Sequence, residues 1–248
     1  LLTKPRKDIS HGPQEHSENI TDKIRTTARA KIYPAVYADT MSTPSLSADA
    51  VLPSLANSIA STEKLLIVGA STGGPPALQG LIPALPAELP AGIVVVQHMP
   101  AGFTRPLAAR LDAASGLSVR EAEQGDRIRA GEVLIAPGGR HLTFVRRESE
   151  TVVTLDLEPS ESLHRPSVDV TMQSAAERWG SGAAGVLLTG MGSDGAAGMW
   201  AIRSRGGWTI AESEESCVVY GMPRAAVDLG AVDEIAPLAG IAERLVAV

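Results

Sequence analysis

Short apolar runs that alternate with longer stretches dominate the chain from Lys64 onward, and they constrain its fold more than any other feature. The runs are LLIVGA, GIVVVQ, EVLIAP, GVLLTG, GWTIAE and VDEIAP. Strands with apolar residues on both faces have to be covered on both faces, and the intervening stretches are long enough to form the covering helices. The pattern therefore predicts an α/β fold, with a doubly wound and mostly parallel sheet between helix layers.

One segment departs from this pattern. The stretch HLTFVRRESETVVTLDLE alternates between apolar and polar residues on either side of a charged turn at residues 147–150. Such alternation around a short polar turn is typical of two antiparallel strands. We therefore expect an antiparallel β-hairpin near residues 141–157, in addition to the parallel sheet.

The N-terminal quarter of the chain has a different composition from the rest. Residues 1–30 begin with a short apolar stub and continue into a charged stretch in which Ile20, Ile24 and Ala28 recur every four residues, as in an amphipathic helix. Residues 31–60 are rich in Ala, Ser, Thr and Pro, which indicates a linker. The predicted organisation is an N-terminal piece (1–30), a linker (31–60) and a main domain (61–248).

Composition excludes several classes of partner. The formal net charge is −6 and aromatic residues make up 3% of the chain, so a nucleic-acid partner is not expected. No apolar run approaches the roughly 20 residues that span a bilayer, and the N-terminus lacks the apolar core of a signal peptide, so we expect a cytoplasmic protein without membrane insertion. The single cysteine, Cys217, excludes an internal disulfide and a CxxC metal cluster.

The first chemical motif is G-x-S-x-G at residues 69–73, between a predicted strand and a predicted helix. This is the nucleophile-elbow pattern, in which small neighbours allow a tight turn that exposes the serine hydroxyl. Two other interpretations of Ser71 stay open at this point. Ser71 can cap the following helix, or the glycines can cradle a phosphate, although no Walker lysine follows them and their spacing is not G-x-G-x-x-G.

A nucleophilic serine needs a base and an orienting acid, and sites in parallel sheets form where strands end. Of the five histidines, His98 and His141 come after apolar runs, and His98 follows its run more closely. Asp194 in GVLLTGMGSDGAAGM is the best-placed acid, with an ordinary helix cap as its alternative role. The resulting order is Ser, His, acid, whereas the common α/β-hydrolases have Ser, acid, His, so the triad predicts a different fold with the same geometry.

Several segments together resemble the chemotaxis protein-glutamate methylesterase family. They are GASTGGPPAL, VVQHMPAGFT, APGGRH, HRPSVDV, LLTGMGSDGAAGM and ESCVVYGMPRAAV, and in this order they span nearly all of residues 64–248. The resemblance implies a doubly wound parallel sheet and hydrolysis of glutamate methyl esters on chemoreceptors. It also implies deamidation of receptor glutamines, which many members carry out. No metal or organic cofactor is implied.

The resemblance also assigns catalytic residues. Carried over position by position, the family's nucleophile falls on Ser71, its histidine on His98 and its aspartate on Asp194. The resemblance further implies that Thr72 and the loop at Met191 lie beside the oxyanion.

The segment HRPSVD supplies two further candidates. His164 and Arg165 are candidate substrate-binding residues, with bracing of the fold as the alternative role of Arg165.

The N-terminal piece resembles part of a response-regulator receiver. LLTKPR resembles the receiver's last strand, with Lys4 and Pro5 as its Lys-Pro pair, and residues 6–30 resemble its final helix. The rest of a receiver, including its phosphorylated aspartate, does not occur in this sequence. Contact with the chemotaxis histidine kinase is therefore expected only through the missing part of the receiver.

These observations predict a serine hydrolase that acts through a glutamyl-enzyme in chemotactic adaptation. Two alternatives belong to other functional classes. A general serine esterase would turn over small acyl esters much faster than receptor methyl esters. A non-catalytic regulatory module would bind nucleotide at the Gly-rich loop without cleaving esters.

Overall fold

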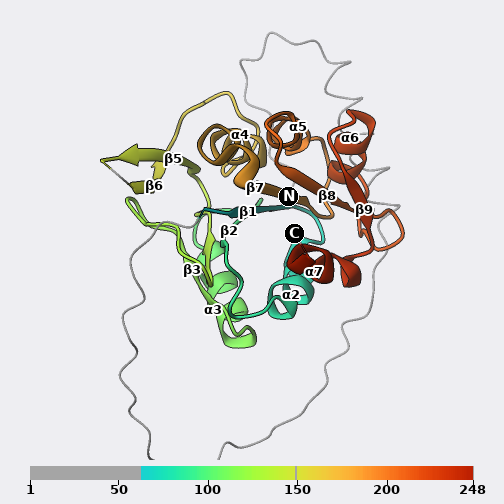
Figure 1. The fold of residues 1–248 in the computed structure, drawn as a ribbon, viewed down its shortest axis with the longest axis horizontal. Helices are drawn as coiled ribbons and strands as arrows, with labels where there is room; N and C mark the ends of the chain where they lie inside the picture. The colour runs from blue at the N-terminus through green and yellow to red at the C-terminus, as the bar shows by residue number, and fades with distance from the viewer. Residues whose placement is uncertain (1–62, 149, 248) are drawn as a thin grey trace, which may run out of the picture.

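The computed structural model describes residues 63–148 and 150–247 (Figure 1). Seven strands form one sheet in the order β3-β4-β2-β1-β7-β8-β9, and every neighbouring pair is parallel. Their bounds are β1 Leu65–Ala70, β2 Gly92–Gln97, β3 Ser118–Glu121, β4 Glu132–Ile135, β7 Ala183–Leu187, β8 Trp208–Glu212 and β9 Glu234–Ala236. The predicted parallel sheet is confirmed, whereas the predicted N-terminal piece (1–30) and linker (31–60) lie outside the described residues.

Helices cover both faces of this sheet (Figure 1). One layer consists of α2 Gly74–Leu81, α3 Thr104–Ala114 and α7 Leu238–Ala247, and the other of α4 Val168–Trp179, α5 Ala196–Ser204 and α6 Met222–Asp228. Two short 3-10 turns, η1 Ile82–Ala84 and η2 Gly180–Gly182, follow α2 and α4. Along β1, Leu66 and Val68 pack with the first layer, while Leu65 and Ile67 pack with the second. This alternation between two cores explains why the strands are continuous apolar runs.

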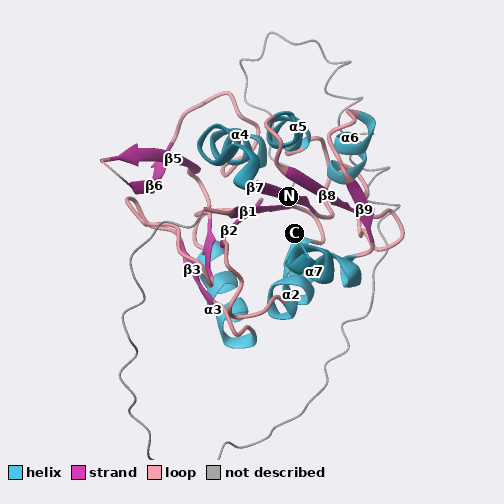
Figure 2. Ribbon diagram, in the orientation of Figure 1, coloured by secondary structure: helices cyan, strands magenta, loops and turns pink. Residues whose placement is uncertain are grey.

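The predicted hairpin is also confirmed. Strands β5 His141–Arg147 and β6 Glu150–Asp156 pair in an antiparallel register and form a separate two-stranded sheet (Figure 2). The hairpin packs against α4, where the rings of Phe144 and Trp179 meet edge to face with centroids 5.0 Å apart. The Thr171 hydroxyl donates a hydrogen bond to the carbonyl of Leu142 at 2.8 Å. These contacts, from Thr171 near the start of α4 to Trp179 at its end, fix the hairpin along the length of the helix.

The order of the strands determines where a site can form. The chain forms β2, β3 and β4 on one side of β1, in the spatial order β2, β4, β3 outward, and it then returns to β7 on the other side of β1. At such a reversal the connections leave in opposite directions, so a crevice opens beyond the carboxyl ends of the strands. The loops that leave β1, β2 and β7 at this point carry Ser71, His98 and Asp194.

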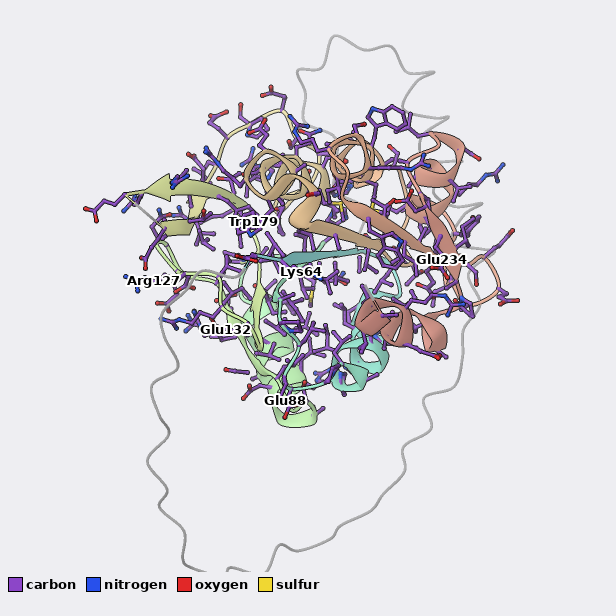
Figure 3. The ribbon with its side chains drawn as sticks, in the orientation of Figure 1. Lys64, Glu88, Arg127, Glu132, Trp179 and Glu234 are labelled. Carbon is purple, nitrogen blue, oxygen red and sulfur yellow. The ribbon has the colours of Figure 1, made fainter. Side chains whose placement is uncertain are left out.

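The opposite end of the sheet is apolar. A pocket of about 200 Å³ lies at the amino ends of the strands, and Lys64, labelled in Figure 3 beside the start of β1, belongs to its lining. Its apolar lining includes Leu65, Ala183, Trp208 and Leu245. Within the described residues, no helix combines the length and the apolar character that a membrane span requires.

Candidate active site

Ser71 lies in a tight turn directly after β1. Its amide donates to the carbonyl of Thr189 at 3.0 Å, and its own carbonyl accepts from the amide of Gly74 at 2.8 Å. Gly73 has φ of 83°, and a Cβ at that residue would lie 2.6 Å from the Cβ of Val218, so only glycine fits the turn. The N-cap of α2 is Gly73, without a side-chain hydrogen bond. The interpretation of Ser71 as a helix cap is therefore wrong.

The pairing of β1 with β2 brings His98 next to Ser71. Ala70 lies opposite Gln97 in the parallel register, and the amide of His98 donates to the carbonyl of Ala70 at 3.1 Å. Extending the register by one residue places Ser71 opposite His98, at a Cα separation of about 5 Å, the usual distance between neighbouring strands. The two residues therefore occupy the same level at the carboxyl end of the sheet.

The Gln97 side chain connects the loop that carries Ser71 with the loop that carries His98. Its side chain is 2% exposed, and its Nε2 donates to the carbonyls of Ser71 at 2.9 Å and His98 at 3.2 Å. Gln97 was not among the residues predicted from the sequence to belong to the site. The available signal was an amide side chain at the end of the otherwise apolar run GIVVVQ.

Asp194 meets the other side of the His98 ring. Its Oδ2 lies 2.7 Å from Nε2 of His98, and the two side chains are 7% (His98) and 12% (Asp194) exposed. Asp194 also accepts hydrogen bonds from the amides of Val168 at 2.8 Å and Asp169 at 3.0 Å, and from the Ser167 hydroxyl at 2.8 Å. The sequence alternative, that Asp194 caps its own helix, is wrong, because α5 has Gly195 as its N-cap and no side-chain hydrogen bond there.

These contacts decide the charge of Asp194. Burial alone would raise the pKa of its carboxyl group, but the hydrogen bonds from His98, Asp169 and Val168 outweigh burial and lower the pKa to about 2. Asp194 is therefore ionised near neutral pH. An ionised carboxylate only accepts hydrogen bonds, so Nε2 of His98 carries the proton in this pair.

The other ring nitrogen of His98 is in a different situation. Nδ1 is buried and has no hydrogen-bond partner among the described residues. The ring of His164 stacks on the ring of His98 with centroids 4.0 Å apart and planes inclined by 18°. His98 is thus held by Asp194 at one edge and by His164 on one face, with an unpartnered nitrogen lone pair.

His141 has a different environment. It is fully buried at the start of β5, and its Nδ1 accepts a hydrogen bond from the amide of Ser167 at 3.3 Å. Burial lowers the pKa of His141, which favours the neutral ring that this hydrogen bond requires. The structure therefore pairs His98, not His141, with Asp194.

Thr189 connects the loops around Ser71. Its hydroxyl donates to the carbonyl of Thr72 at 2.9 Å and accepts from the amide of Val219 at 2.9 Å. The next residue, Gly190, passes so close that a Cβ there would lie 2.8 Å from the Cβ of Ser71. Met191 follows Gly190 in the same loop, and Thr72 follows Ser71 directly. Within the described residues, neither the amide of Thr72 nor that of Met191 donates to a protein group.

Comparisons with known proteins show the family of this chain. Residues 66–245 match the family model described as CheB methylesterase. The chain belongs to the CheB methylesterase family. The family and the enzyme class predicted from the sequence are thereby confirmed.

Individual relatives of this CheB-family chain cover most of its length. It is 48% identical over 245 residues to "Protein-glutamate methylesterase/protein-glutamine glutaminase 1" of Geobacter metallireducens, across 99% of this chain and 67% of that protein. It is 48% identical over 246 residues, with the same two shares, to a Bordetella bronchiseptica protein named as a protein-glutamate methylesterase/protein-glutamine glutaminase. The crystal structure of the Thermotoga maritima CheB methylesterase catalytic domain is similar with a TM-score of 0.72 and 45% identity, and the match covers 74% of this chain and 97% of that one.

The remaining candidates of this CheB-family chain lie on the loop between β6 and α4. The Arg165 side chain donates from Nη2 to the carbonyl of Ser160 at 2.7 Å, and the Arg165 carbonyl accepts from the amide of Gly139 at 3.0 Å. Arg165 thus braces this loop. His164 is exposed and its ring stacks on the ring of the candidate base, His98.

A buried acid lies beneath the site. Glu212, at the end of β8, is fully buried, and its carboxylate accepts from the amide of Thr189 at 2.8 Å and the Ser216 hydroxyl at 3.0 Å. Burial raises the pKa of Glu212 and also raises that of the neighbouring Cys217 thiol, which makes the thiol a poor nucleophile. Among the described residues, no group of His, Cys, Asp and Glu side chains is arranged to hold a metal ion.

Proposed function

We propose that this chain hydrolyses glutamate methyl esters on chemoreceptors and also deamidates receptor glutamines, with Ser71 as nucleophile, His98 as base and Asp194 as the orienting acid. The observation that carries the proposal is the 2.7 Å contact between His98 and Asp194, at the carboxyl end of the sheet where the Ser71 turn also lies. The names of the relatives supply the two reactions. We also propose residues 61–248 as the catalytic domain.

The two nitrogens of His98 have defined roles in this mechanism. Because Nε2 carries the proton that faces ionised Asp194, the basic lone pair is on Nδ1. Nδ1 therefore takes the proton from the Ser71 hydroxyl. In the chymotrypsin template Nε2 is the base and Nδ1 faces the aspartate, so the two ring nitrogens exchange roles here.

Acylation begins when Oγ of Ser71 attacks the γ-carbonyl carbon of a glutamate methyl ester and Nδ1 of His98 accepts the hydroxyl proton. The carbonyl oxygen becomes an oxyanion, and the amides of Thr72 and Met191 are the proposed donors that stabilise it. When the tetrahedral intermediate collapses, the C–O bond to the methoxy group breaks. His98 returns the proton to that oxygen, so methanol leaves and a glutamyl ester of Ser71 remains.

Deacylation repeats these steps with water. Nδ1 of His98 accepts a proton from the attacking water, and the Ser71 oxygen leaves with that proton, which releases glutamate. With a glutamine substrate the first leaving group is ammonia instead of methanol. Because an amide nitrogen is a poorer leaving group, its protonation by His98 matters more in deamidation.

The experiment that tests this function is methanol release from methylated chemoreceptor. Ser71→Ala should abolish release, because it removes the nucleophilic oxygen, and should leave the thermal unfolding midpoint nearly unchanged, because the Ser71 backbone contacts persist. Ser193→Ala is the matched control, since Ser193 is an exposed serine in the loop of Asp194. Methanol release by folded Ser71→Ala at the wild-type rate would exclude the proposed nucleophile.

A further inference from the structure

Asp169 and Asp194 form a reciprocal pair at the N-termini of α4 and α5. Asp194 precedes α5, yet its carboxylate accepts from the amides of Val168 and Asp169 in the first turn of α4. Asp169 lies in that first turn, and its Oδ1 accepts from the amides of Gly195 at 2.9 Å and Gly198 at 2.7 Å at the start of α5. Each aspartate thus satisfies the free N–H groups of the other's helix.

The Asp169 carboxylate is not needed for its own helix. Ser167 is the N-cap of α4, and its hydroxyl accepts from the amide of Val170. In α5 the situation is the reverse, because its N-cap Gly195 has no side chain and leaves the first amides without an intrahelical partner. The two hydrogen bonds to Asp169 are therefore the side-chain cap of α5.

This cap fixes the backbone on the C-terminal side of Asp194. Gly195 has φ of 100°, and a Cβ there would lie 2.5 Å from a methyl group of Leu187, so the turn tolerates only glycine. The Gly195 amide is part of the peptide bond that joins Asp194 to Gly195. This amide donates its hydrogen bond to Asp169, so Asp169 fixes the peptide bond that follows Asp194. The Asp194 side chain is held by α4 and the Asp194 peptide by Asp169, so the carboxylate has little freedom relative to His98.

We propose that Asp169 is a positioning residue that sets the place of the Asp194 carboxylate, and through it the orientation of His98. The inference rests on the proposed function for its kinetic consequence, but the placement of Asp194 is a property of the protein without substrate. Asp169 itself touches neither Ser71 nor His98 in the described hydrogen bonds. Its effect should therefore be on the catalytic rate rather than on substrate affinity.

The kinetic test compares Asp169→Ala with Asp169→Asn in the full chain. Alanine removes the acceptor for both α5 amides, whereas asparagine keeps a carbonyl oxygen at the same distance. We expect Asp169→Ala to lower kcat by between about 10-fold and 100-fold with KM within about twofold, as a displacement of about 1 Å in a catalytic group would. Asp169→Asn should restore kcat to within about threefold of wild type.

Asp112→Ala is the matched control. Asp112 also accepts a backbone hydrogen bond, from the amide of Val119 at 2.8 Å, but it lies near the C-terminal end of α3. Its loss should lower the unfolding midpoint and leave kcat unchanged. A purely structural role of Asp169 would give the same result as this control.

A second measurement needs no substrate and separates this inference from the proposed function. In NMR spectra of protein labelled with ¹⁵N-histidine, the proton on Nε2 of His98 should give a downfield signal because it is shared with Asp194 at 2.7 Å. The signal should shift or broaden in Asp169→Ala and stay in place in Asp169→Asn and Asp112→Ala. If wild-type protein releases no methanol, the proposed function fails, while this signal still tests the role of Asp169.

Two results would overturn the inference. One is a folded Asp169→Ala protein with the wild-type His98 signal and a kcat within about threefold of wild type. The other applies even if the alanine variant does not fold: a folded Asp169→Asn protein whose kcat is more than about tenfold lower, because its acceptor oxygen is intact.

Discussion

The two ends of the seven-stranded sheet differ in how they are built. At the carboxyl end, buried polar side chains such as Gln97, Thr189 and Glu212 form hydrogen bonds that join one loop to another. At the amino end, the same strands start in an apolar pocket that includes Leu65 and Trp208. Packing at the amino end is non-directional, whereas hydrogen bonds at the carboxyl end fix atoms at defined distances.

This difference separates stability from catalysis. A buried polar group is costly unless it is hydrogen-bonded, so the fold gains little from placing several of them at one end. What they provide is a defined position for the loops that carry Ser71 and His98. Substitutions that disturb Ser71, His98 or the side chains that contact them should therefore change rates, and substitutions at the amino end should change stability.

The largest effect on kcat should come from one of the two histidines that the sequence left as candidates, namely His98. His98→Gln removes the proton-accepting nitrogen and should lower kcat for methanol release by about 10²- to 10⁴-fold. His141→Gln should leave kcat within a few fold, because a glutamine oxygen can accept from Ser167, and should cost about 1–3 kcal/mol of unfolding free energy.

Steady-state kinetics and denaturant unfolding of the two variants test this ranking. The opposite ranking, with His141→Gln inactive and His98→Gln active, would show that the hydrogen bond to Asp194 does not mark the catalytic base.

The intermediate effect should be confined to stability. Leu65 is 1% exposed and lies at the amino end of β1, so Leu65→Ala should lower the unfolding free energy by about 2–5 kcal/mol. At a temperature where the variant is folded, kcat should stay within about twofold of wild type. A tenfold lower kcat in the folded variant would contradict the expectation that substitutions at the amino end change stability but not the catalytic rate.

The fold was predictable because strand burial on two faces leaves a continuous apolar signal. Strand β3 was missed, since it lies at the sheet edge and only Val119 among its residues is buried. Its sequence SVRE therefore lacks the apolar run that identified the others.

The positions of candidate site residues could be predicted where a residue directly follows a strand, as for Ser71 and His98. The capping partners were not, because Asp169 and Asp194 are 25 positions apart and meet only when α4 and α5 pack together. A local capping rule predicts that each aspartate accepts hydrogen bonds from the amides of its own helix. In the structure each aspartate accepts them from the first turn of the other helix. Gln97 and Thr189 were missed for a related reason, since their partners lie on other loops.

The smallest effect concerns Glu212, one of the buried polar side chains at the carboxyl end of the sheet. Because burial raises the pKa of Glu212 in the folded protein, the folded state binds a proton more tightly than the unfolded chain does. Stability from this group is therefore present below the unfolded pKa of about 4.5 and is lost as pH rises through the higher folded pKa. Within that window the unfolding free energy falls by at most about 1.4 kcal/mol per pH unit.

Glu212→Gln should remove this part of the pH dependence, because glutamine does not ionise and its oxygen can still accept from Thr189. The unfolding free energies of wild type and variant should be measured from pH 5 to pH 8. Toward pH 8 the wild type should lose stability relative to the variant, so that the two curves converge or cross.

Asp169 also has a pKa raised by burial, but it is present in both proteins and cancels in the difference. Glu88→Gln, at an exposed position, is the control and should give parallel curves. Parallel curves for Glu212→Gln as well would mean that Glu212 ionises in the folded protein as readily as in water, and that the carboxyl-end core is more hydrated than its burial indicates.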